Sequence, residues 1–493
     1  MTDSRSIEYN RIQMTKWFVI PFLLIGPVCH AQSVTIDWTN VHQVIDGFGA
    51  NDYNESGTNN PPSAFFTSAQ AAILFGTGPG QLGLTILRTG VPDNGTGYSM
   101  GDCTSVSVNC AGIYLPDYQL ASTYPGVRVY LTPFSPPAVY KTINSPLCNN
   151  DGNTLATAHY QDFANWITNS VKSIQQFGGI TVAAATLQNE PEFCLPTSGP
   201  GATYSASQIA TFIQNNLGPT FASNGLGSVL ILAPATSYYS DMNAYGYVCA
   251  TTPACSNYLG GFAHSGYQNH LTLPDTVDPG PLPSGWTSAG GRYWQGEISC
   301  FSGGGGPSWC TADWGNTIAN ALGFAADIDQ RLAGDGMNAY NFWWFMMPAA
   351  TGIGEALLDQ TTNTPALRGY VFGQYSKFVR PGYFRIDATH KPVAGVSVSA
   401  YQNTTGGNLT VVATNYTGSP VTQTFNVVNA PTFTSVTPYI TSAKQNIQAQ
   451  AAQSVSGNSF TYTLPADSVT TFVGTSSGST APVPPTKVQA VVN

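Results

Sequence analysis

Short apolar segments alternate with amphipathic helical segments from residue 44 to residue 375. The eight apolar segments are VIDGFGA, LTILRTG, VRVYLTPFS, ITVAAATLQ, SVLILAP, FAHSGY, RYWQGEIS and NAYNFWWFM. Residues 160–179 show a clear helical pattern, because apolar side chains recur there at helical spacing before Gly178-Gly179 ends the helix. Apolar strands that are joined by helices form parallel sheets covered on both faces. Eight such units predict a (β/α)8 barrel of the α/β class over residues 44–375.

A different pattern begins at residue 376. Segments such as NLTVVATNYT and SVTTFVG alternate apolar and polar residues and are separated by Gly, Asn and Pro. This alternation predicts an antiparallel β-sandwich over residues 376–474. Residues 32–43 include SVTIDWTN, which has the same alternation, and we expect them to add an N-terminal strand to the sandwich. Residues 475–493 are rich in Ser, Gly and Pro and predict a flexible tail.

The N-terminal segment is typical of a secretory signal peptide. Lys16 precedes the apolar run WFVIPFLLIGPVC, and small residues precede Gln32. The run is too short to span a bilayer comfortably, so a retained membrane anchor is the less favoured alternative. We therefore expect residues 1–31 to be removed, with Met14 as an alternative start. The mature protein is expected to be extracellular or periplasmic and free of the membrane.

The cysteines are consistent with export. Eight of the nine remain once the signal peptide is removed, and an even number suits a disulfide-bonded protein. Short spacing favours four pairs, out of about 105 possible connectivities: Cys103/Cys110, Cys249/Cys255, Cys300/Cys310 and, by what is left, Cys148/Cys194. Neither the cysteines nor the six scattered histidines have the spacing of a zinc site, so no metal and no cofactor are expected.

The composition narrows the class of partner. Charged residues make up 8% of the chain, against about 25% in typical soluble domains, and the net charge is −9 without runs of Lys or Arg. This balance argues against nucleic acid and anionic membranes as partners. A polar surface built from uncharged residues, with 12% aromatic residues, is compatible with binding neutral polyols such as sugars. We expect a monomer that binds a polysaccharide.

Two glutamates follow strand-like segments in a chain that contains only six glutamates. Glu190 follows ITVAAATLQ in the segment LQNEPEF, and Glu297 ends RYWQGE. Barrel enzymes place their active sites at the C-terminal ends of the strands, and glycoside hydrolysis needs two facing carboxyl groups. Glu192 and Glu355 have no partner at a strand mouth and are given no catalytic role. Pro191 ends the strand and is expected to carry Glu192 towards the rim. A glutamate at a strand end can also merely cap a helix, and this alternative stays open.

Several motifs together resemble glycoside hydrolase family 30, specifically its bacterial xylanase-like branch. They are IDGFGA (45–50), LTILRTG, LTPFSPPAVYK (131–141), LQNEPEF, HSGYQ (264–268), YWQGEIS (293–299), FWWF (342–345) and RGYVFGQYSKFVRPGYFRI (368–386). The resemblance runs over nearly all of the mature chain. It implies a TIM barrel with a side-docked antiparallel β-sandwich, to which the N-terminal strand also contributes.

The resemblance also implies roles for residues at the strand ends. Glu190 would be the general acid/base and Glu297 the nucleophile of a retaining double displacement. Asn189 would hold the sugar 2-hydroxyl. Arg88 and Tyr267 would keep Glu297 ionised, while burial and the neighbouring carboxylate would keep Glu190 protonated.

Five further residues are expected to bind substrate. Phe134 and Ser135 lie in the LTPFSPP segment, and His264 lies in HSGYQ. Trp343 and Trp344 form an aromatic pair at the end of the eighth strand. We favour Trp344 as the residue whose ring stacks on the sugar, with a place in the barrel core as the alternative.

Two departures from the family bear on specificity. Phe134 stands where family members commonly carry Trp, which alters one wall of the cleft. The tryptophan pair is followed by Met346-Met347-Pro348-Ala349, without the arginines that grip a glucuronate branch in bacterial glucuronoxylanases. The loop 300–310 is expected to reshape the cleft instead.

These observations predict a secreted endo-β-1,4-xylanase that does not depend on glucuronate branches. A β-1,6-glucanase or β-galactanase of the same family is the alternative enzyme. A non-catalytic carbohydrate-binding protein is the alternative of another class, although the presence of both glutamates argues against it.

Overall fold

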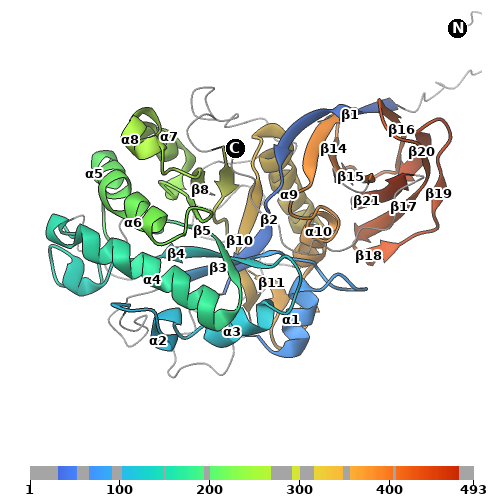
Figure 1. Cartoon of the computed structure of the whole chain (residues 1–493). Helices are drawn as coiled ribbons and strands as arrows, with labels where there is room; N and C mark the ends of the chain where they lie inside the picture. Colours follow the sequence, from blue (N-terminus) through green and yellow to red (C-terminus); the bar gives the residue numbers. More distant parts are fainter. Residues whose placement is uncertain are drawn as a thin grey trace, which may run out of the picture. The chain divides into compact units, whose positions relative to one another are not determined.

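Two sheets contain the strands of the described part of the chain (Figure 1). The computed structural model describes residues 32–52, 66–91, 103–148, 152–193, 200–267, 291–299, 316–347, 356–403 and 407–476. The predicted signal peptide, the loop 300–310 and most of the predicted tail lie outside these residues.

The first sheet is a parallel barrel. Its barrel strands are β2 (Gly47–Asn51), β3 (Ile86–Val91), β4 (Arg128–Pro133), β5 (Thr181–Ala185), β6 (Leu230–Ile231), β7 (Thr236–Tyr238), β8 (Phe262–Tyr267), β9 (Tyr293–Gln295) and β10 (Ala339–Met347). They pair in the order β6-β5-β4-β3-β2-β10-β9-β8-β7. Two further strands extend β10, where β11 (Ala356–Asp359) pairs parallel with β10 and antiparallel with β12 (Thr364–Pro365). All eight segments that were predicted as strands contribute to this sheet.

The fifth strand of the barrel is split into β6 and β7. The first piece pairs with β5 and the second pairs with β8, and a cis Ala233-Pro234 bond lies between them. The backbone N–H of Leu232 donates to the Ala185 carbonyl at 2.9 Å, and that of Ala233 donates to the Gly261 carbonyl at 3.1 Å. The two ends of the strand order therefore meet in one segment, which closes the barrel. The predicted (β/α)8 architecture is confirmed.

Helices follow most of the strands and cover the outside of the barrel (Figure 1). They are α1 (Ser68–Phe75), α2 (Val108–Ala111), α3 (Leu115–Ala121), α4 (Tyr160–Gly178), α5 (Ala206–Phe212), α6 (Gly218–Ser223), α7 (Tyr239–Thr251), α8 (Pro253–Ser256), α9 (Ile318–Asp329) and α10 (Leu367–Ser376). Helix α4 shows how the sequence pattern works, because Phe163, Ile167 and Val171 are all buried. Each such side chain contributes roughly 1.5–3 kcal/mol when fully buried. The helix ends at Gly179, whose φ of 65° is unfavourable for residues with a side chain.

The interior of the barrel is filled rather than hollow. Trp294 and Tyr130 point inward and pack edge to face, with ring centroids 5.3 Å apart. The Trp294 indole N–H donates to Asp46 Oδ2 at 2.8 Å. Because the interior is packed, ligands can reach the barrel only at its ends.

The second sheet has ten strands. They are β1 (Gln32–Val44), β13 (Phe384–Ala388), β14 (Val396–Gln402), β15 (Asn408–Asn415), β16 (Val421–Val428), β17 (Phe433–Ser442), β18 (Gln445–Ala449), β19 (Gln453–Ser454), β20 (Ser459–Leu464) and β21 (Ser468–Ser476). Phe425 of β16 and Phe460 of β20 pack against Phe472 of β21, with ring centroids 5.1 and 5.2 Å away. Strands from opposite ends of the sheet order thus enclose one apolar core, as in a sandwich.

One pairing in this sheet departs from the antiparallel expectation. Strand β1 pairs antiparallel with β13 but parallel with β16. It comes from the opposite end of the chain and fills the position between those two strands, so no hairpin connection dictates its direction.

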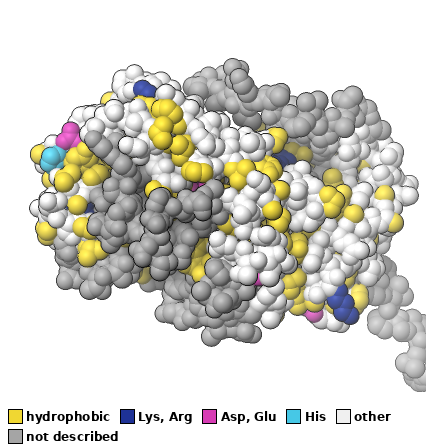
Figure 2. Space-filling model, turned by 90° about the horizontal axis from the view of Figure 1, so that it is seen from below, with side chains coloured by type: hydrophobic (Ala, Val, Ile, Leu, Met, Phe, Trp, Pro, Cys, Tyr) yellow, Lys and Arg dark blue, Asp and Glu magenta, His cyan; other side chains and the backbone are white. Residues whose placement is uncertain are grey.

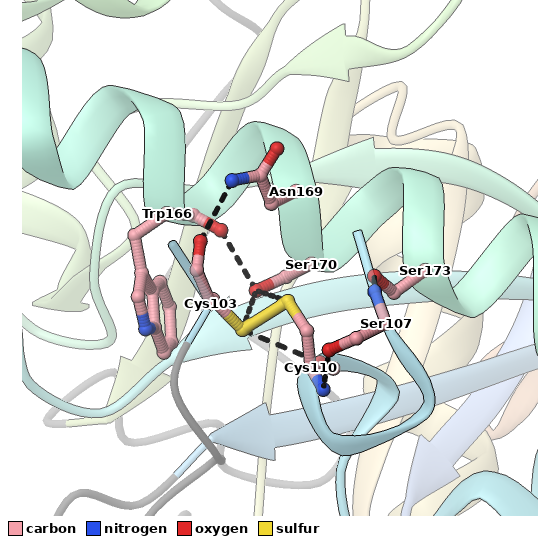
Figure 3. The surroundings of a disulfide bond; sticks show 7 residues. All are labelled: Cys103, Ser107, Cys110, Trp166, Asn169, Ser170 and Ser173. Atoms are coloured by element: carbon pink, nitrogen blue, oxygen red, sulfur yellow. Dashed lines mark hydrogen bonds between the residues drawn. A yellow bond between two sulfur atoms is a disulfide. The ribbon is translucent and has the colours of Figure 1, made fainter. Parts of the chain in front are cut away.

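Two local disulfides link the loops and helices of the barrel. Cys103 pairs with Cys110, and Cys249 pairs with Cys255, as their spacing predicted. In Figure 3 the first disulfide lies against α4, where the Asn169 side-chain amide donates to the Cys103 carbonyl at 2.7 Å. Cys148 is also disulfide-bonded, whereas Cys194, Cys300 and Cys310 lie outside the described residues.

The described surface carries few charges. On the face shown in Figure 2, the Lys, Arg, Asp and Glu side chains occur singly or in small groups among uncharged side chains. Within the described ranges, no helix has the length and apolarity needed to cross a membrane. The same part of the chain contains no cluster of three or more His, Cys, Asp or Glu residues suited to a metal ion.

Candidate active site

Polar and aromatic side chains collect at the C-terminal end of the barrel. Arg88 lies in β3 and Tyr267 is the last residue of β8. Glu190 lies in the turn after β5, and Glu297 follows β9 by two residues. Because all eight barrel strands are parallel, residues at their C-terminal ends meet at one mouth.

Glu297 is held by two donors. Its Oε2 lies 2.8 Å from Arg88 Nη2, and its Oε1 accepts a hydrogen bond of 2.8 Å from the Tyr267 hydroxyl. Glu297 is 6% exposed and Arg88 is 1% exposed, so this ion pair is almost completely removed from water. The two contacts fix the orientation of the carboxylate.

Arg88 also reaches the residue beside the other candidate catalytic glutamate. Its Nη2 donates to Asn189 Oδ1 at 2.6 Å. The guanidinium carbon lies 6.0 Å from the ring centroids of Tyr130 and Phe134 and 5.6 Å from that of Trp343. The surrounding aromatic rings restrict the position of the planar guanidinium group. Cation–π attraction to these rings adds to the ion pair with Glu297.

Glu190 has an unusual backbone and a shifted pKa. Its φ is 47°, in the left-handed region that residues with a side chain rarely adopt. Its N–H donates to the carbonyl of Ala235, whose φ of 62° is also positive. Burial, followed by the nearby charges of Glu297 and Glu192, raises the pKa of Glu190 to about 8. Burial and the neighbouring carboxylates therefore favour the protonated form of Glu190.

Phe134 and Trp343 form an aromatic wall at the mouth. Their rings meet edge to face, with centroids 6.2 Å apart, and both side chains are half-buried. Gly90 lies beneath Phe134, and a Cβ at this position would come within 1.7 Å of the phenyl ring. Trp344 is only 6% exposed, whereas Trp343 is the more accessible of the pair. Trp343 therefore offers more accessible ring surface at the mouth, and stacking of a sugar on Trp344 stays a prediction.

Ser135 and His264 do not join the cluster. The Ser135 hydroxyl is fully buried and accepts a hydrogen bond of 3.0 Å from Lys141 Nζ. His264 Nε2 is 2.9 Å from the Tyr293 hydroxyl, and Tyr293 belongs to the core outside the barrel. Ala263 faces the barrel interior, so its neighbour His264 must point outward. Both predictions of substrate contact are corrected by these positions.

Glu192 contacts the C-terminal end of the fifth strand, a partner that the sequence did not indicate. Its Oε1 accepts hydrogen bonds from the backbone N–H groups of Ser237 and Tyr238 in β7, the latter at 3.4 Å. The side chain is half-buried, and burial raises its pKa to about 7. The chain after Pro191 therefore lies against the end of the fifth strand.

Two residues near the carboxyl groups were not anticipated. Ser265 forms a side-chain hydrogen bond to Glu190 that lowers its pKa, opposing the effect of burial. Tyr130 packs beside Arg88 and closes the floor of the mouth. Strand alternation could have indicated Ser265, since it lies two residues before Tyr267 and therefore on the same face.

The chain is similar to known xylanases over almost its whole length. No protein-family model matches it. It is 28% identical over 466 residues to glucuronoxylanase XynC of Bacillus subtilis (strain 168). The aligned region covers 92% of this chain and 96% of that protein. The structure resembles Xyn30A, a glycoside hydrolase family 30 subfamily 8 xylanase from Clostridium acetobutylicum, with a TM-score of 0.72 and 27% identity. A family 30 endoxylanase from Clostridium papyrosolvens C71 matches with a TM-score of 0.71 and 25% identity. Each structural match covers 90% of this chain and 100% of the other.

A fourth protein shares the fold. The endo-β1,6-glucanase BT3312 matches with a TM-score of 0.67 and 19% identity, over 90% of this chain and 94% of that one.

Proposed function

We propose that this chain, which is a glycoside hydrolase of the family 30 xylanase type, cleaves β-1,4-xylan with retention of anomeric configuration. Glu190 is the general acid/base and Glu297 is the nucleophile. The observation that carries this assignment is the contrast between the two carboxyl groups. Glu297 is ion-paired with Arg88 and hydrogen-bonded to Tyr267, whereas burial raises the pKa of Glu190 to about 8. Carboxyl groups with such different environments suit the two opposite roles.

The reaction has two steps. In the first, Glu297 attacks the anomeric carbon while protonated Glu190 gives its proton to the departing glycosidic oxygen, which leaves a covalent glycosyl-enzyme. In the second, the Glu190 carboxylate takes a proton from water, the water oxygen attacks the anomeric carbon, and the bond to Glu297 breaks. Asn189, fixed by Arg88, is placed to bind the sugar hydroxyl next to the anomeric carbon. Trp343 and Phe134 offer aromatic surface to the sugar rings.

Independence from glucuronate branches is a second part of the proposal. The curated relative is named a glucuronoxylanase, and recognition of a glucuronate carboxylate calls for a bidentate cation such as Arg. In this chain, β10 ends at Met347 and the sequence continues with Pro348-Ala349, without a cation. The wall provided by Phe134 and Trp343 is apolar and suits unbranched xylose units.

Secretion and a monomeric state complete the proposal. Export rests on the signal-like residues 1–31 and is supported by the disulfides Cys103–Cys110 and Cys249–Cys255, which form and persist in oxidising compartments.

One set of assays tests the function. Purified protein is incubated with glucuronoxylan, arabinoxylan, unsubstituted xylo-oligosaccharides, β-1,6-glucan and β-galactan, beside the variants Glu190→Gln and Glu297→Gln. We expect cleavage of unsubstituted xylo-oligosaccharides, loss of cleavage in both variants, and β-anomeric products in NMR spectra taken early in the reaction. Strict preference for glucuronoxylan would contradict the branch independence. Cleavage of β-1,6-glucan or β-galactan alone would replace xylan as the substrate, and no hydrolysis at all would favour a carbohydrate-binding protein.

A further inference from the structure

The turn that carries Glu190 is attached to the fifth barrel strand at several points. The Glu190 N–H donates to the Ala235 carbonyl at 2.9 Å. Two residues later, Glu192 Oε1 accepts from the backbone N–H groups of Ser237 and Tyr238. Phe193 continues the attachment, since its ring packs edge to face against that of Tyr238 at 6.0 Å. Residues separated by about 45 positions in the sequence are thereby joined next to the acid/base.

The two residues joined by the backbone hydrogen bond, Glu190 and Ala235, both have an unusual backbone conformation. Glu190 and Ala235 both have positive φ, at 47° and 62°, and neither is a glycine. Such conformations persist only where the surrounding contacts impose them. The Phe193 N–H closes the turn on the Glu190 carbonyl at 3.1 Å, but this bond lies within the turn and cannot orient it relative to the barrel. The side chain of Glu192 adds hydrogen bonds between turn and strand to the Glu190–Ala235 bond and the Phe193–Tyr238 ring contact.

We propose that Glu192 is a positioning residue for Glu190: its carboxylate fastens the acid/base turn to β7 and sets the charge around the acid. This inference rests on the proposed function of Glu190. Glu192 itself touches no reacting atom in the proposal, because its Oε1 is occupied by the backbone of β7.

The electrostatic consequence has a definite sign. The charged and titratable groups facing Glu190 are Glu297, Arg88, Tyr267 and Glu192, while Asp241 of α7 faces Glu192. The pKa of Glu192 is about 7, so it is mostly ionised where Glu190 titrates, near 8. Its negative charge opposes ionisation of Glu190. Removing the charge lowers the pKa of Glu190 and moves the basic limb of the pH profile of kcat/KM to lower pH.

Two variants separate the tie from the charge. Glu192→Gln retains an oxygen that can accept from Ser237 and Tyr238 but removes the charge. Glu192→Ala removes both. Asp162→Asn is a matched control, because Asp162 lies on the surface of α4 with its side chain 51% exposed, and it changes the net charge by the same amount.

Two substrates separate positioning of the acid from general damage. Natural xylo-oligosaccharides need a proton from Glu190 to release the leaving group, whereas dinitrophenyl β-xylobioside does not. For Glu192→Ala we expect kcat/KM on xylohexaose to fall about 10-fold or more, part of the 10²–10⁴-fold that acid catalysis supplies. On dinitrophenyl β-xylobioside we expect a change within about 3-fold. For Glu192→Gln we expect mainly the shift of the basic limb, with the control unchanged.

A measurement independent of activity completes the test. Hydrogen exchange of the Ser237 and Tyr238 amides, followed by mass spectrometry or NMR, is expected to be faster in Glu192→Ala than in the wild type and the control. Equal losses on both substrates, an unmoved basic limb in Glu192→Gln, or unchanged exchange would each overturn the proposal. If the wild type cleaves neither substrate, the proposed function itself fails, and this result is separate from any behaviour of the variants.

Discussion

Arg88 Nη2 lies 2.8 Å from Glu297 Oε2, in an ion pair that is almost completely buried. The same nitrogen also donates to Asn189, so one side chain holds the proposed nucleophile and the neighbour of the proposed acid/base. Removing one partner of a buried pair leaves the other charge uncompensated, which typically costs about 3–5 kcal/mol. The positions of Glu297 and Asn189 therefore depend on this arginine.

Replacing Arg88 by Met is expected to reduce both activity and stability. Glu297 would lose its buried counter-ion, and we expect kcat/KM to fall by at least about 100-fold, as for loss of a positioned electrostatic partner. Urea unfolding should show a loss of about 3–5 kcal/mol. The double variant Arg88→Met/Glu297→Gln serves as the control, since it removes both charges and should regain part of the stability. Full stability in the single variant would contradict the burial of the pair.

The pH profile is expected to report Glu190. An acid must be protonated to act, and the pKa of Glu190 is raised to about 8, chiefly by burial. The value of kcat/KM should therefore decline around pH 8, which is well above the pH at which an ordinary carboxyl group ionises. A basic limb below pH 6 on xylo-oligosaccharides would show that Glu190 is not the acid in the free enzyme.

Glu190→Gln should lose far more activity on natural substrates than on substrates with an activated leaving group. With dinitrophenyl β-xylobioside, the first step needs no acid, so the glycosyl-enzyme still forms and its hydrolysis becomes limiting. Added azide should then accelerate turnover and yield a β-glycosyl azide, because azide attacks without a general base. Absence of the azide product would assign the acid/base role to another residue.

Gly90→Ala is expected to disturb the aromatic wall. A Cβ at this position would lie 1.7 Å from the Phe134 ring, so the ring must move. Overpacking of this kind costs typically about 1–3 kcal/mol. We expect a higher KM for xylo-oligosaccharides together with a lower Tm. Gly227→Ala is the control, because a Cβ there meets nothing within 4 Å, and its effect on both quantities should be small.

Asp52 links stability to pH. It is fully buried after β2, and burial followed by the charge of Asp117 raises its pKa well above the usual range. In the unfolded chain the same carboxyl ionises near pH 4, so its stabilising contribution is present below that pH and is lost as the pH rises towards the folded pKa. Asp52→Asn should therefore be more stable than the wild type at pH 8 and gain little at pH 4, as measured by urea unfolding. An equal effect at both pH values would contradict the raised pKa.

The sequence pattern was sufficient for the architecture and for the placement of Glu190 and Glu297 at one end of the barrel. The eight apolar segments became the barrel strands, with SVLILAP and the residues after it forming the split fifth strand. Parallel strands expose their C-terminal ends on one side of the barrel. Residues that follow strands, such as Glu190 and Glu297, could therefore be placed at one mouth from the sequence alone. Short cysteine spacing likewise indicated the pairs Cys103–Cys110 and Cys249–Cys255, because a short loop brings two cysteines close by itself.

Local patterns did not determine which way individual side chains point. His264 faces the outer core because Ala263 faces the barrel interior, and Trp344 is buried where the β10 pairing with β2 shifts register. The Ser135 hydroxyl, in the loop after β4, accepts a hydrogen bond from Lys141 Nζ.

Glu192 shows the limit most clearly. Its partners Ser237 and Tyr238 lie on another strand, and nothing in the segment LQNEPEF specifies which backbone will lie opposite. The sequence by itself determined the order of the strands, the end at which the carboxyl groups gather and the identity of the two catalytic candidates, because these follow from strand direction and period. Only the tertiary structure decided that Glu192 bonds to the backbone of β7 and that Arg88 contacts both Glu297 and Asn189, because those contacts arise when distant segments pack.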